Sequence, residues 1–161
     1  MIPFPLISSF PRSPFWDERQ RAHVKVQGYC LACLRTSPAV ELNVHHKWPF
    51  HIVVQLGRPD LELDERNLYT LCEKCHLWIG HLDDWQSYNP NLLYWISLGR
   101  GLTEKQIEAM IRVQNQREKK PARFDKLSQL DRAGLRKKLD LQLPPSKEVL
   151  TTYRLTVETY K

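Results

Sequence analysis

Two Cys-x-x-Cys pairs constrain this chain more than any other feature of its sequence. Cys30 and Cys33 form the first pair, and Cys72 and Cys75 form the second. Each spacing lets two sulfur atoms converge on one ion from a tight turn, so two pairs supply the four thiolates of a tetrahedral zinc site. Such a site has no coordination position left for water. We therefore expect a structural zinc that clamps two distant segments together.

The alternative for the cysteines is two disulfides in a secreted protein. All four cysteines of the 161-residue chain belong to the two pairs, which favours metal binding. Prolines interrupt the apolar first ten residues and no basic residue precedes them, so this segment predicts neither a signal peptide nor a membrane span. We expect a cytoplasmic protein of a bacterial or phage-infected cell, with reduced thiols and no membrane partner.

The net charge of +6 is unevenly distributed along the chain. Residues 1–99 carry 9 Lys and Arg against 10 Asp and Glu, a net charge of −1, whereas residues 100–161 carry 15 against 8, a net charge of +7. A basic segment beside a nearly neutral metal module favours a polyanionic partner, and nucleic acid is the commonest one. The alternative is an ordinary solvated helix surface, because acidic residues are interspersed among the basic ones.

The segment before the first cysteine pair predicts a helix from about Pro14 to Gln27. Ser13 suits the N-cap, proline suits the first helical position, and Gly28 suits the C-terminal stop. We expect this helix to pack Trp16 and part of the His23–Val26 face onto the zinc module.

Two strands are predicted between the cysteine pairs. Apolar and polar residues alternate at positions 40–44, as in a half-buried strand, and this segment runs directly into His45 and His46. Residues 50–66 are mixed in character and predict a long connection. A short second strand is predicted at 67–71.

The rest of the chain is predicted to be mainly helical. Residues 72–86 have helical spacing, and we expect Trp78 and Trp85 on the apolar face to lie in the core rather than to act as base-stacking platforms. Three further helices are expected. The first spans 92–98, and the second opens with the Thr103–Gln106 capping box, carries Ile107, Met110 and Ile111 in one stripe, and ends before Pro121. The third is expected along Leu127, Leu130 and Leu139. The spacing at 149–160 fits a helix and a strand equally well.

The segment from Cys30 to His81, about a third of the chain, resembles the HNH nucleases, also called ββα-metal endonucleases. The shared elements are the first cysteine pair, His45-His46 with Pro49, Asn67-Leu68, and Leu71-Cys72-Glu73-Lys74-Cys75-His76. The resemblance implies an α+β fold with a zinc-clamped ββα-metal (HNH) core, an N-terminal helix and additional C-terminal helices. We expect an N-terminal arm at 1–13, an HNH nuclease domain at 14–99 and a basic, mainly helical C-terminal extension at 100–161.

The resemblance also implies a division of roles among the polar residues. His45 and His76 would be ligands of a catalytic metal, and His46 would be the general base that takes a proton from water. Asn67 would orient the base and its loop with both ends of its amide. In a regular strand adjacent side chains face opposite sides, so only the resemblance places His45 and His46 in one site.

His81 is a candidate third metal ligand that must satisfy a geometric condition. It lies five residues beyond His76, which corresponds to about 140° around an α-helix. His81 would reach the metal only if Gly80 lets the helix distort, and otherwise water would complete the coordination shell. His51 is expected to be a surface or substrate contact.

The function implied by the resemblance is a metal-dependent endonuclease that hydrolyses phosphodiester bonds in DNA, with double-stranded DNA favoured over RNA. The cofactors would be a structural Zn²⁺ and a catalytic divalent metal, namely Ni²⁺, Co²⁺, Mn²⁺, Zn²⁺ or Mg²⁺. DNA-binding residues are predicted in the basic extension at Arg117, Lys119, Lys120 and Arg123. The alternatives are a non-catalytic zinc-stapled DNA- or RNA-binding module and a zinc domain that binds another protein. The sequence does not indicate the oligomeric state.

Overall fold

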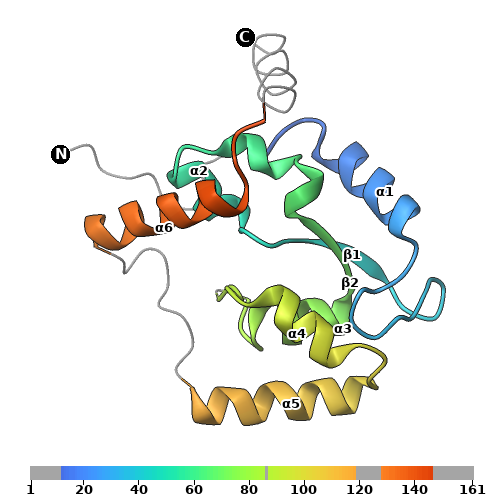
Figure 1. Cartoon of the computed structure of the whole chain (residues 1–161). Coiled ribbons are helices and arrows are strands. Elements are labelled where there is room, and N and C mark those ends of the chain that lie inside the picture. The colour runs from blue at the N-terminus through green and yellow to red at the C-terminus, as the bar shows by residue number, and fades with distance from the viewer. Residues whose placement is uncertain (1–11, 86, 119–127, 147–161) are drawn as a thin grey trace.

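The computed structural model describes residues 12–85, 87–118 and 128–146 (Figure 1). The chain has the predicted α+β fold, built on a two-stranded antiparallel sheet. Strand β1 (Leu42–His46) pairs with β2 (Leu68–Cys72), and the register places His46 opposite Leu68. No helix of the described residues is long and apolar enough to cross a membrane.

Helices cover this hairpin from two sides. Helix α1 (Trp16–Gln27) packs along one side, and the short helix α3 (Glu73–Cys75) with the following turn η4 (His76–Gly80) packs on the other (Figure 1). Because both sides of β1 are covered, three consecutive residues, Val44, His45 and His46, are all buried. A strand with one solvated face would instead alternate buried and exposed residues.

Helix α1 begins two residues later than predicted but ends at the expected glycine. Its N-cap is Phe15 rather than Ser13, and the backbone N–H of Ser13 donates to the Glu62 carboxylate over 2.9 Å. Gly28 has φ of +67°, the left-handed conformation that favours glycine at a helix C-terminus. The expected packing is wrong in part, because Val26 is 89% exposed and Trp16 stacks on His46 rather than on the cysteine cluster.

The prediction of a long connection at residues 50–66 is wrong. Pro49 is followed by a short helix, α2 (Phe50–Gln55), and by two 3₁₀ turns, η2 (Pro59–Glu62) and η3 (Glu65–Asn67). The β-branched residues Ile52 and Val53 have modest helix propensity, yet both are fully buried. Tertiary burial therefore decides the conformation of this segment.

The predicted helix at 72–86 is shorter and less regular than expected. α3 passes into η4, a π-helical turn, and the helix ends at His81. Leu82 and Asp83 follow with φ of +54° and +62°, which no right-handed helix allows. As a result Trp85 leaves the core and is 55% exposed, whereas Trp78 is half-buried against the core as expected.

The next two helices largely follow the prediction. Helix α4 spans Leu92–Gly99, and the Asn89 side chain accepts a hydrogen bond from the backbone N–H of Asn91 over 2.9 Å just before it. Helix α5 spans Glu104–Arg117 and opens with the predicted capping box between Thr103 and Gln106. Ile107 and Ile111 of its apolar stripe are fully buried, and Met110 packs beside them.

Helix α6 (Gln129–Gln142) closes the described part of the chain. Its Leu139 is fully buried as predicted, but Leu130 is 82% exposed, and Leu127 lies outside the described residues. The guanidinium of Arg58 bonds Asp60, Asp140 at the end of α6 and the carbonyl of Leu143. These hydrogen bonds fix the end of α6 to η2.

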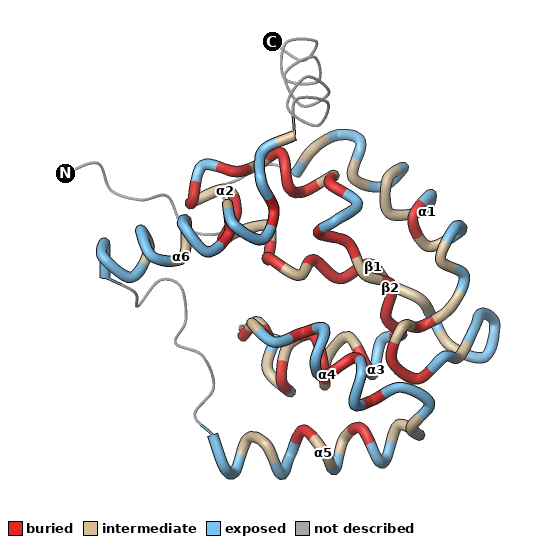
Figure 2. Tube along the Cα trace, viewed as in Figure 1, coloured by how far each residue is buried: buried red, intermediate tan, exposed pale blue. Residues whose placement is uncertain are grey.

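Two clusters of buried side chains form the core, and both include residues beyond position 100 (Figure 2). The first cluster surrounds the cysteines and contains Ile107 and Ile111 of α5. The second surrounds Trp48 and α2 and contains Leu139 and Leu143. The division between residues 99 and 100 stays a prediction, but α5 and α6 both contribute to the core.

Two terminal segments for which the sequence made predictions are not described by the structure. Residues 1–11 and the segment at 149–160, whose conformation the sequence left open, lie outside the described residues.

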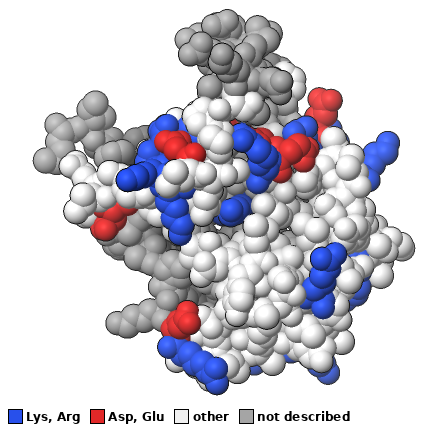
Figure 3. All heavy atoms as spheres, in the orientation of Figure 1, with Lys and Arg blue, Asp and Glu red and all other residues white. Residues whose placement is uncertain are grey.

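The surface around α6 carries charges of both signs. Figure 3 shows Lys and Arg interspersed with Asp and Glu over the upper part of the face in view, around α6. One such pair is Arg136 with Asp140, at 2.7 Å. Within the described residues, this mixture fits the solvated-surface alternative for α6.

Candidate functional site

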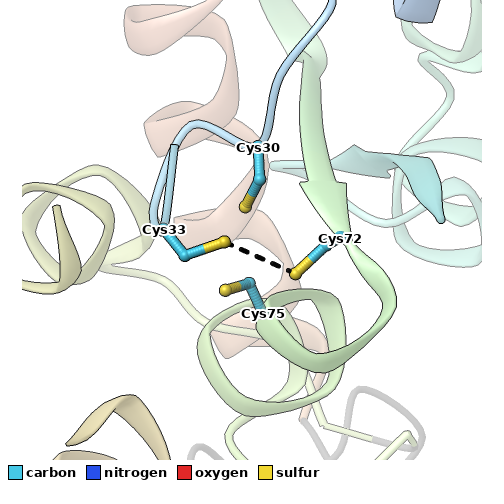
Figure 4. A group of neighbouring side chains, drawn as sticks. All are labelled: Cys30, Cys33, Cys72 and Cys75. Atoms are coloured by element: carbon cyan, nitrogen blue, oxygen red, sulfur yellow. Dashed lines mark hydrogen bonds between the residues drawn. The ribbon is translucent and has the colours of Figure 1, made fainter. Parts of the chain in front are cut away.

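The four cysteines of the chain meet in one buried cluster. Cys30 and Cys33 come from the loop after α1, Cys72 ends β2, and Cys75 ends α3 (Figure 4). All four Sγ atoms lie within 4.8 Å of one another, and those of Cys33 and Cys72 are 3.7 Å apart. Zinc–sulfur bonds of about 2.3 Å in a tetrahedron require sulfur atoms about 3.8 Å apart. The cluster therefore has the donor set and spacing of a structural zinc site.

Protonation of the cluster supports the same conclusion. Hydrogen bonding with Cys72 lowers the pKa of Cys30, and hydrogen bonding with Cys30 raises the pKa of Cys72 to about 12. One sulfur can thus ionise easily, but further ionisation places negative charges together in a buried space. A cation at the centre removes this repulsion and lets all four bind as thiolates.

Arg35 supplies positive charge at the edge of the cysteine cluster. Its Nε donates to the Sγ of Cys33 over 3.4 Å, and its Nη2 forms an ion pair with Glu104 of α5 at 2.6 Å. Hydrogen bonds to coordinating sulfur atoms orient them and offset their charge. Arg35 thereby connects the cysteine cluster to the N-terminus of α5.

A second group of possible metal ligands lies where β1 meets η4. The candidate ligand atoms of His45, His76 and His81 all lie within 4.8 Å of one another. The Nε2 atoms of His76 and His81 are 3.3 Å apart, and the Nε2 of His45 is buried without a hydrogen-bond partner. A buried polar atom of this kind is costly unless something binds it. Three imidazoles that leave one side open suit a catalytic metal ion.

The π-helical turn brings His81 into this group. In an α-helix His76 and His81 would lie on different sides, but a π-helix pairs residues i and i+5. The backbone N–H of His81 donates to the carbonyl of His76, which is this pairing. A Cβ on Gly80 would lie 2.8 Å from two atoms of the His45 ring. Glycine therefore lets that ring rest directly against the turn.

The environment keeps these imidazoles neutral and orients one of them. Burial, and then the neighbouring charges of His76 and His81, lower the pKa of His45, and burial lowers the pKa of His76 to about 4. The Nδ1 of His81 lies 2.8 Å from the carbonyl of Ser87, which can only accept, so Nδ1 carries the proton. The Nε2 of His81 is then left with a lone pair that faces the other two rings.

His46 lies beside this group with a different environment. Its Nε2 donates to the carbonyl of Glu62 over 3.0 Å, so a neutral ring must keep its lone pair on Nδ1. The Trp16 ring stacks on it at 4.5 Å between centroids, and burial lowers the pKa of His46 to about 3. His46 is therefore a neutral imidazole held in one tautomer.

Asn67 fastens the loop that follows His46. Its Oδ1 accepts from the backbone N–H of Trp48 over 2.8 Å, and its Nδ2 donates to the carbonyls of Trp48 and Leu61 over 3.1 and 2.9 Å. Both ends of the amide are thus used, and the side chain is fully buried. None of these three hydrogen bonds goes to His46. Asn67 fixes the carbonyl of Leu61, next to the Glu62 carbonyl that holds the imidazole.

The four histidines open on one cavity of about 550 Å³. His51 also lines this cavity, and its role as a surface or substrate contact stays a prediction. Arg12, Phe50 and Trp85 also line the cavity. The sequence did not predict this position for Arg12 or Phe50, and it predicted that Trp85 lies in the core, which is wrong. No pattern in the sequence marks these residues, because they reach the histidines only through the packing of α1, α2 and the segment after η4.

Of the predicted DNA-binding residues, only Arg117 is among the described residues, and it does not line this cavity. Arg117 ends α5, and Lys119, Lys120 and Arg123 lie outside the described residues. Their assignment stays a prediction.

Comparison with known families identifies the segment that carries both clusters. Residues 30–81 match the family model described as HNH endonuclease, as the sequence resemblance implied. No curated protein and no solved structure matches the chain. The matched segment contains the four cysteines and all five histidines that line the cavity. It indicates a function related to nucleic acid, of the nuclease type.

Proposed function

From the premise that residues 30–81 form an HNH domain, we propose that the protein is a metal-dependent endonuclease that hydrolyses phosphodiester bonds in DNA. The observation that carries the proposal is the position of His46 beside His45, His76 and His81 around one cavity. A pure binding module needs a zinc clamp but has no use for a neutral base next to three converging imidazoles.

His46 is the proposed general base. Because its Nε2–H is bound to the Glu62 carbonyl, Nδ1 can accept a proton from a water molecule. The resulting oxygen nucleophile attacks phosphorus in line with the leaving group. The bond from phosphorus to the 3′ oxygen breaks, which leaves a 5′-phosphate and, after the 3′ oxygen takes a proton from solvent, a 3′-hydroxyl.

His45, His76 and His81 are the proposed holders of the catalytic metal. A divalent cation bound there supplies positive charge to the phosphate, whose anionic oxygens otherwise repel the nucleophile. Three neutral imidazoles favour Ni²⁺, Co²⁺, Mn²⁺ or Zn²⁺ over Mg²⁺, which prefers oxygen ligands. Mg²⁺ remains a candidate for turnover at millimolar concentration.

The other predicted residues have positioning roles in this proposal. Asn67 keeps the loop after His46 and the η2 carbonyls in place, so the base holds one orientation. A structural Zn²⁺ at the cysteine cluster joins the first loop to the hairpin and α3, and thus fixes β1 relative to η4. The basic segment from Arg117 to Arg123 is proposed to add affinity for the DNA backbone.

The test is cleavage of supercoiled plasmid by purified protein across a panel of divalent metals. Nicked or linear product with at least one metal, abolished in His46→Ala, would support the proposal. Parallel assays with single-stranded DNA and RNA identify the preferred substrate. Zinc-loaded, folded protein that binds DNA but cleaves with none of the metals would instead favour the non-catalytic zinc-stapled module.

A further inference from the structure

Arg12 occupies a distinctive place at the edge of the catalytic cavity. It is the only Lys or Arg among the described residues that line the cavity, and no Asp or Glu is among them. Its guanidinium carbon lies 4.7 Å from the centroid of the Trp16 ring and 5.0 Å from that of Phe50. Two aromatic rings thus hold a planar cation where substrate would enter.

The surroundings of Arg12 leave part of its guanidinium accessible. Its Nη1 is 3.4 Å from Oε1 of Glu62, a long contact, while the other oxygen of that carboxylate accepts from the Ser13 backbone. The Arg12 side chain is 47% exposed, whereas that of Glu62 is 2% exposed. Contact with aromatic faces limits the rotamers of an arginine without using its hydrogen-bond donors. The side chain is therefore held in position and still able to bind a ligand.

The charge of the cavity matches a phosphate ligand. Because Arg12 is the only Lys or Arg in the described lining and no Asp or Glu lies there, its guanidinium is the fixed positive charge that this lining provides. Each phosphodiester carries one negative charge, and a guanidinium can bind two of its oxygens at once. A strand whose scissile phosphate lay at the histidines would run past the Trp16 ring, which contacts both His46 and Arg12.

We infer that Arg12 binds a backbone phosphate of the substrate strand, next to the phosphate that is cleaved. This inference rests on the proposed function, because it takes the cavity ligand to be a nucleic-acid strand. The role differs from that of the predicted basic segment at 117–123. Arg12 would place the strand relative to His46, whereas that segment is proposed only to add affinity for the DNA backbone.

The competing explanation is that Arg12 only fastens the chain before α1 to η2 through Glu62. The two roles separate in a binding assay with a short DNA duplex, carried out without added divalent metal so that no cleavage occurs. Affinity is measured at several salt concentrations for the parent, Arg12→Met and Arg12→Lys. Zinc content and melting temperature are measured for each variant.

The matched control is Arg19→Met. Arg19 lies on α1, is ion-paired with Glu65 at 3.0 Å and donates to the carbonyl of Leu63, but it does not line the cavity. It therefore tests the loss of a partly exposed, ion-paired arginine at a neighbouring position.

We expect Arg12→Met to weaken binding about tenfold, the usual effect of losing a charged hydrogen bond. The slope of log affinity against log salt should become shallower by about 0.9, the value for one phosphate contact. Arg12→Lys should keep the slope but bind more weakly than the parent, because lysine keeps the charge and loses the two-pronged contact. Arg19→Met should keep the parent slope.

A folded Arg12→Met protein with the parent affinity and salt slope would overturn the inference. If Arg12→Met does not fold, Arg12→Lys decides, and parent-like affinity in that variant would refute the phosphate contact. Failure of the proposed function looks different. In that case the parent cleaves no substrate with any metal, while the altered salt slope of Arg12→Met still shows the phosphate contact.

Discussion

The Nε2 atoms of His76 and His81 lie 3.3 Å apart across a π-helical turn. Gly80, within the same turn, lets the third histidine join them, because it leaves room for the His45 ring against the backbone of the turn. The proposed metal site is thus built from one strand end and one irregular helix. Its geometry should respond to small changes at Gly80.

Gly80→Ala should impair the three-histidine site while sparing the cysteine cluster. The new Cβ would lie 2.8 Å from the His45 ring, so the ring must move. Overpacking of this kind costs about 1–3 kcal/mol of stability. We expect at least tenfold weaker binding of Co²⁺ or Ni²⁺ by calorimetry, with unchanged zinc content.

Gly134→Ala is the matched control for this change. A Cβ there meets nothing within 4 Å, and the residue lies inside α6. Alanine should stabilise the helix by about 0.5–1 kcal/mol and leave metal binding at the parent value. Equal metal affinity in both glycine variants would show that His45 does not need the space at Gly80.

Cys72→Ser should unfold the core. Binding of a structural zinc contributes on the order of 10 kcal/mol in small zinc domains, comparable to the whole stability of a domain of this size. Circular dichroism and elemental analysis of the purified variant would measure the loss. Well-folded parent protein that contains no zinc would exclude this role for the cysteine cluster.

His46→Ala should lower the cleavage rate about 100-fold or more, because the base acts in the chemical step. Zinc content and DNA affinity should remain close to those of the parent. Single-turnover plasmid cleavage at saturating protein separates the chemical step from binding. A parent-like cleavage rate in this variant would mean that His46 is not the base.

Stability should fall as the pH drops below about 6.5, the ordinary pKa of histidine. Burial lowers the pKa of His46 to about 3 and that of His76 to about 4 in the folded protein. The unfolded chain therefore takes up protons first, and the stability that these neutral rings provide above pH 6.5 is lost as the pH falls through these values.

The contribution of one ring can be measured by difference. His46→Gln removes about one proton from the uptake on unfolding, so its unfolding free energy should depend less steeply on pH by about 1.4 kcal/mol per pH unit between about pH 4 and 6. Urea denaturation at a series of pH values gives this slope. Parallel curves for parent and variant would show that His46 titrates normally in the folded state.

The basic segment should be tested by charge reversal rather than by truncation. Removing residues 101–161 would also remove Ile107, Ile111 and Leu139, which are fully buried, so the truncated protein should be insoluble. Reversing the charges of Lys119, Lys120 and Arg123 leaves these residues in place. We expect a flatter salt dependence of DNA binding, by about 0.9 for each lost phosphate contact. A folded variant with the parent slope would rule the segment out.

Local patterns account for much of what could be predicted. The cysteine spacing, the capping box at Thr103 and the helix stop at Gly28 each depend only on residues that lie within a few positions of one another. Such patterns also place the two strands to within about two residues. The family resemblance adds the identity of the site histidines, because it carries information about a fold that spacing alone does not contain.

Other features depended on contacts between distant segments. The sequence predicted a connection at 50–66, but burial of Ile52 and Val53 against α6 stabilises α2. The helical period placed Trp85 in the core, whereas the chain leaves the helix at His81 and exposes that ring at the cavity. Neither result follows from the local residues, because each depends on which surface is available for packing.

The sequence by itself determined the two cysteine pairs, the order of the ββα elements and the set of histidines available for chemistry. Only the tertiary structure decided that His81 joins His45 and His76, and that Arg12 reaches the same cavity. The physical reason is that spacing along the chain specifies hydrogen bonds and caps between near neighbours. The shape of a site depends on how buried rings fit together, and here that fit requires the space left by one glycine and the stacking of Trp16 on His46.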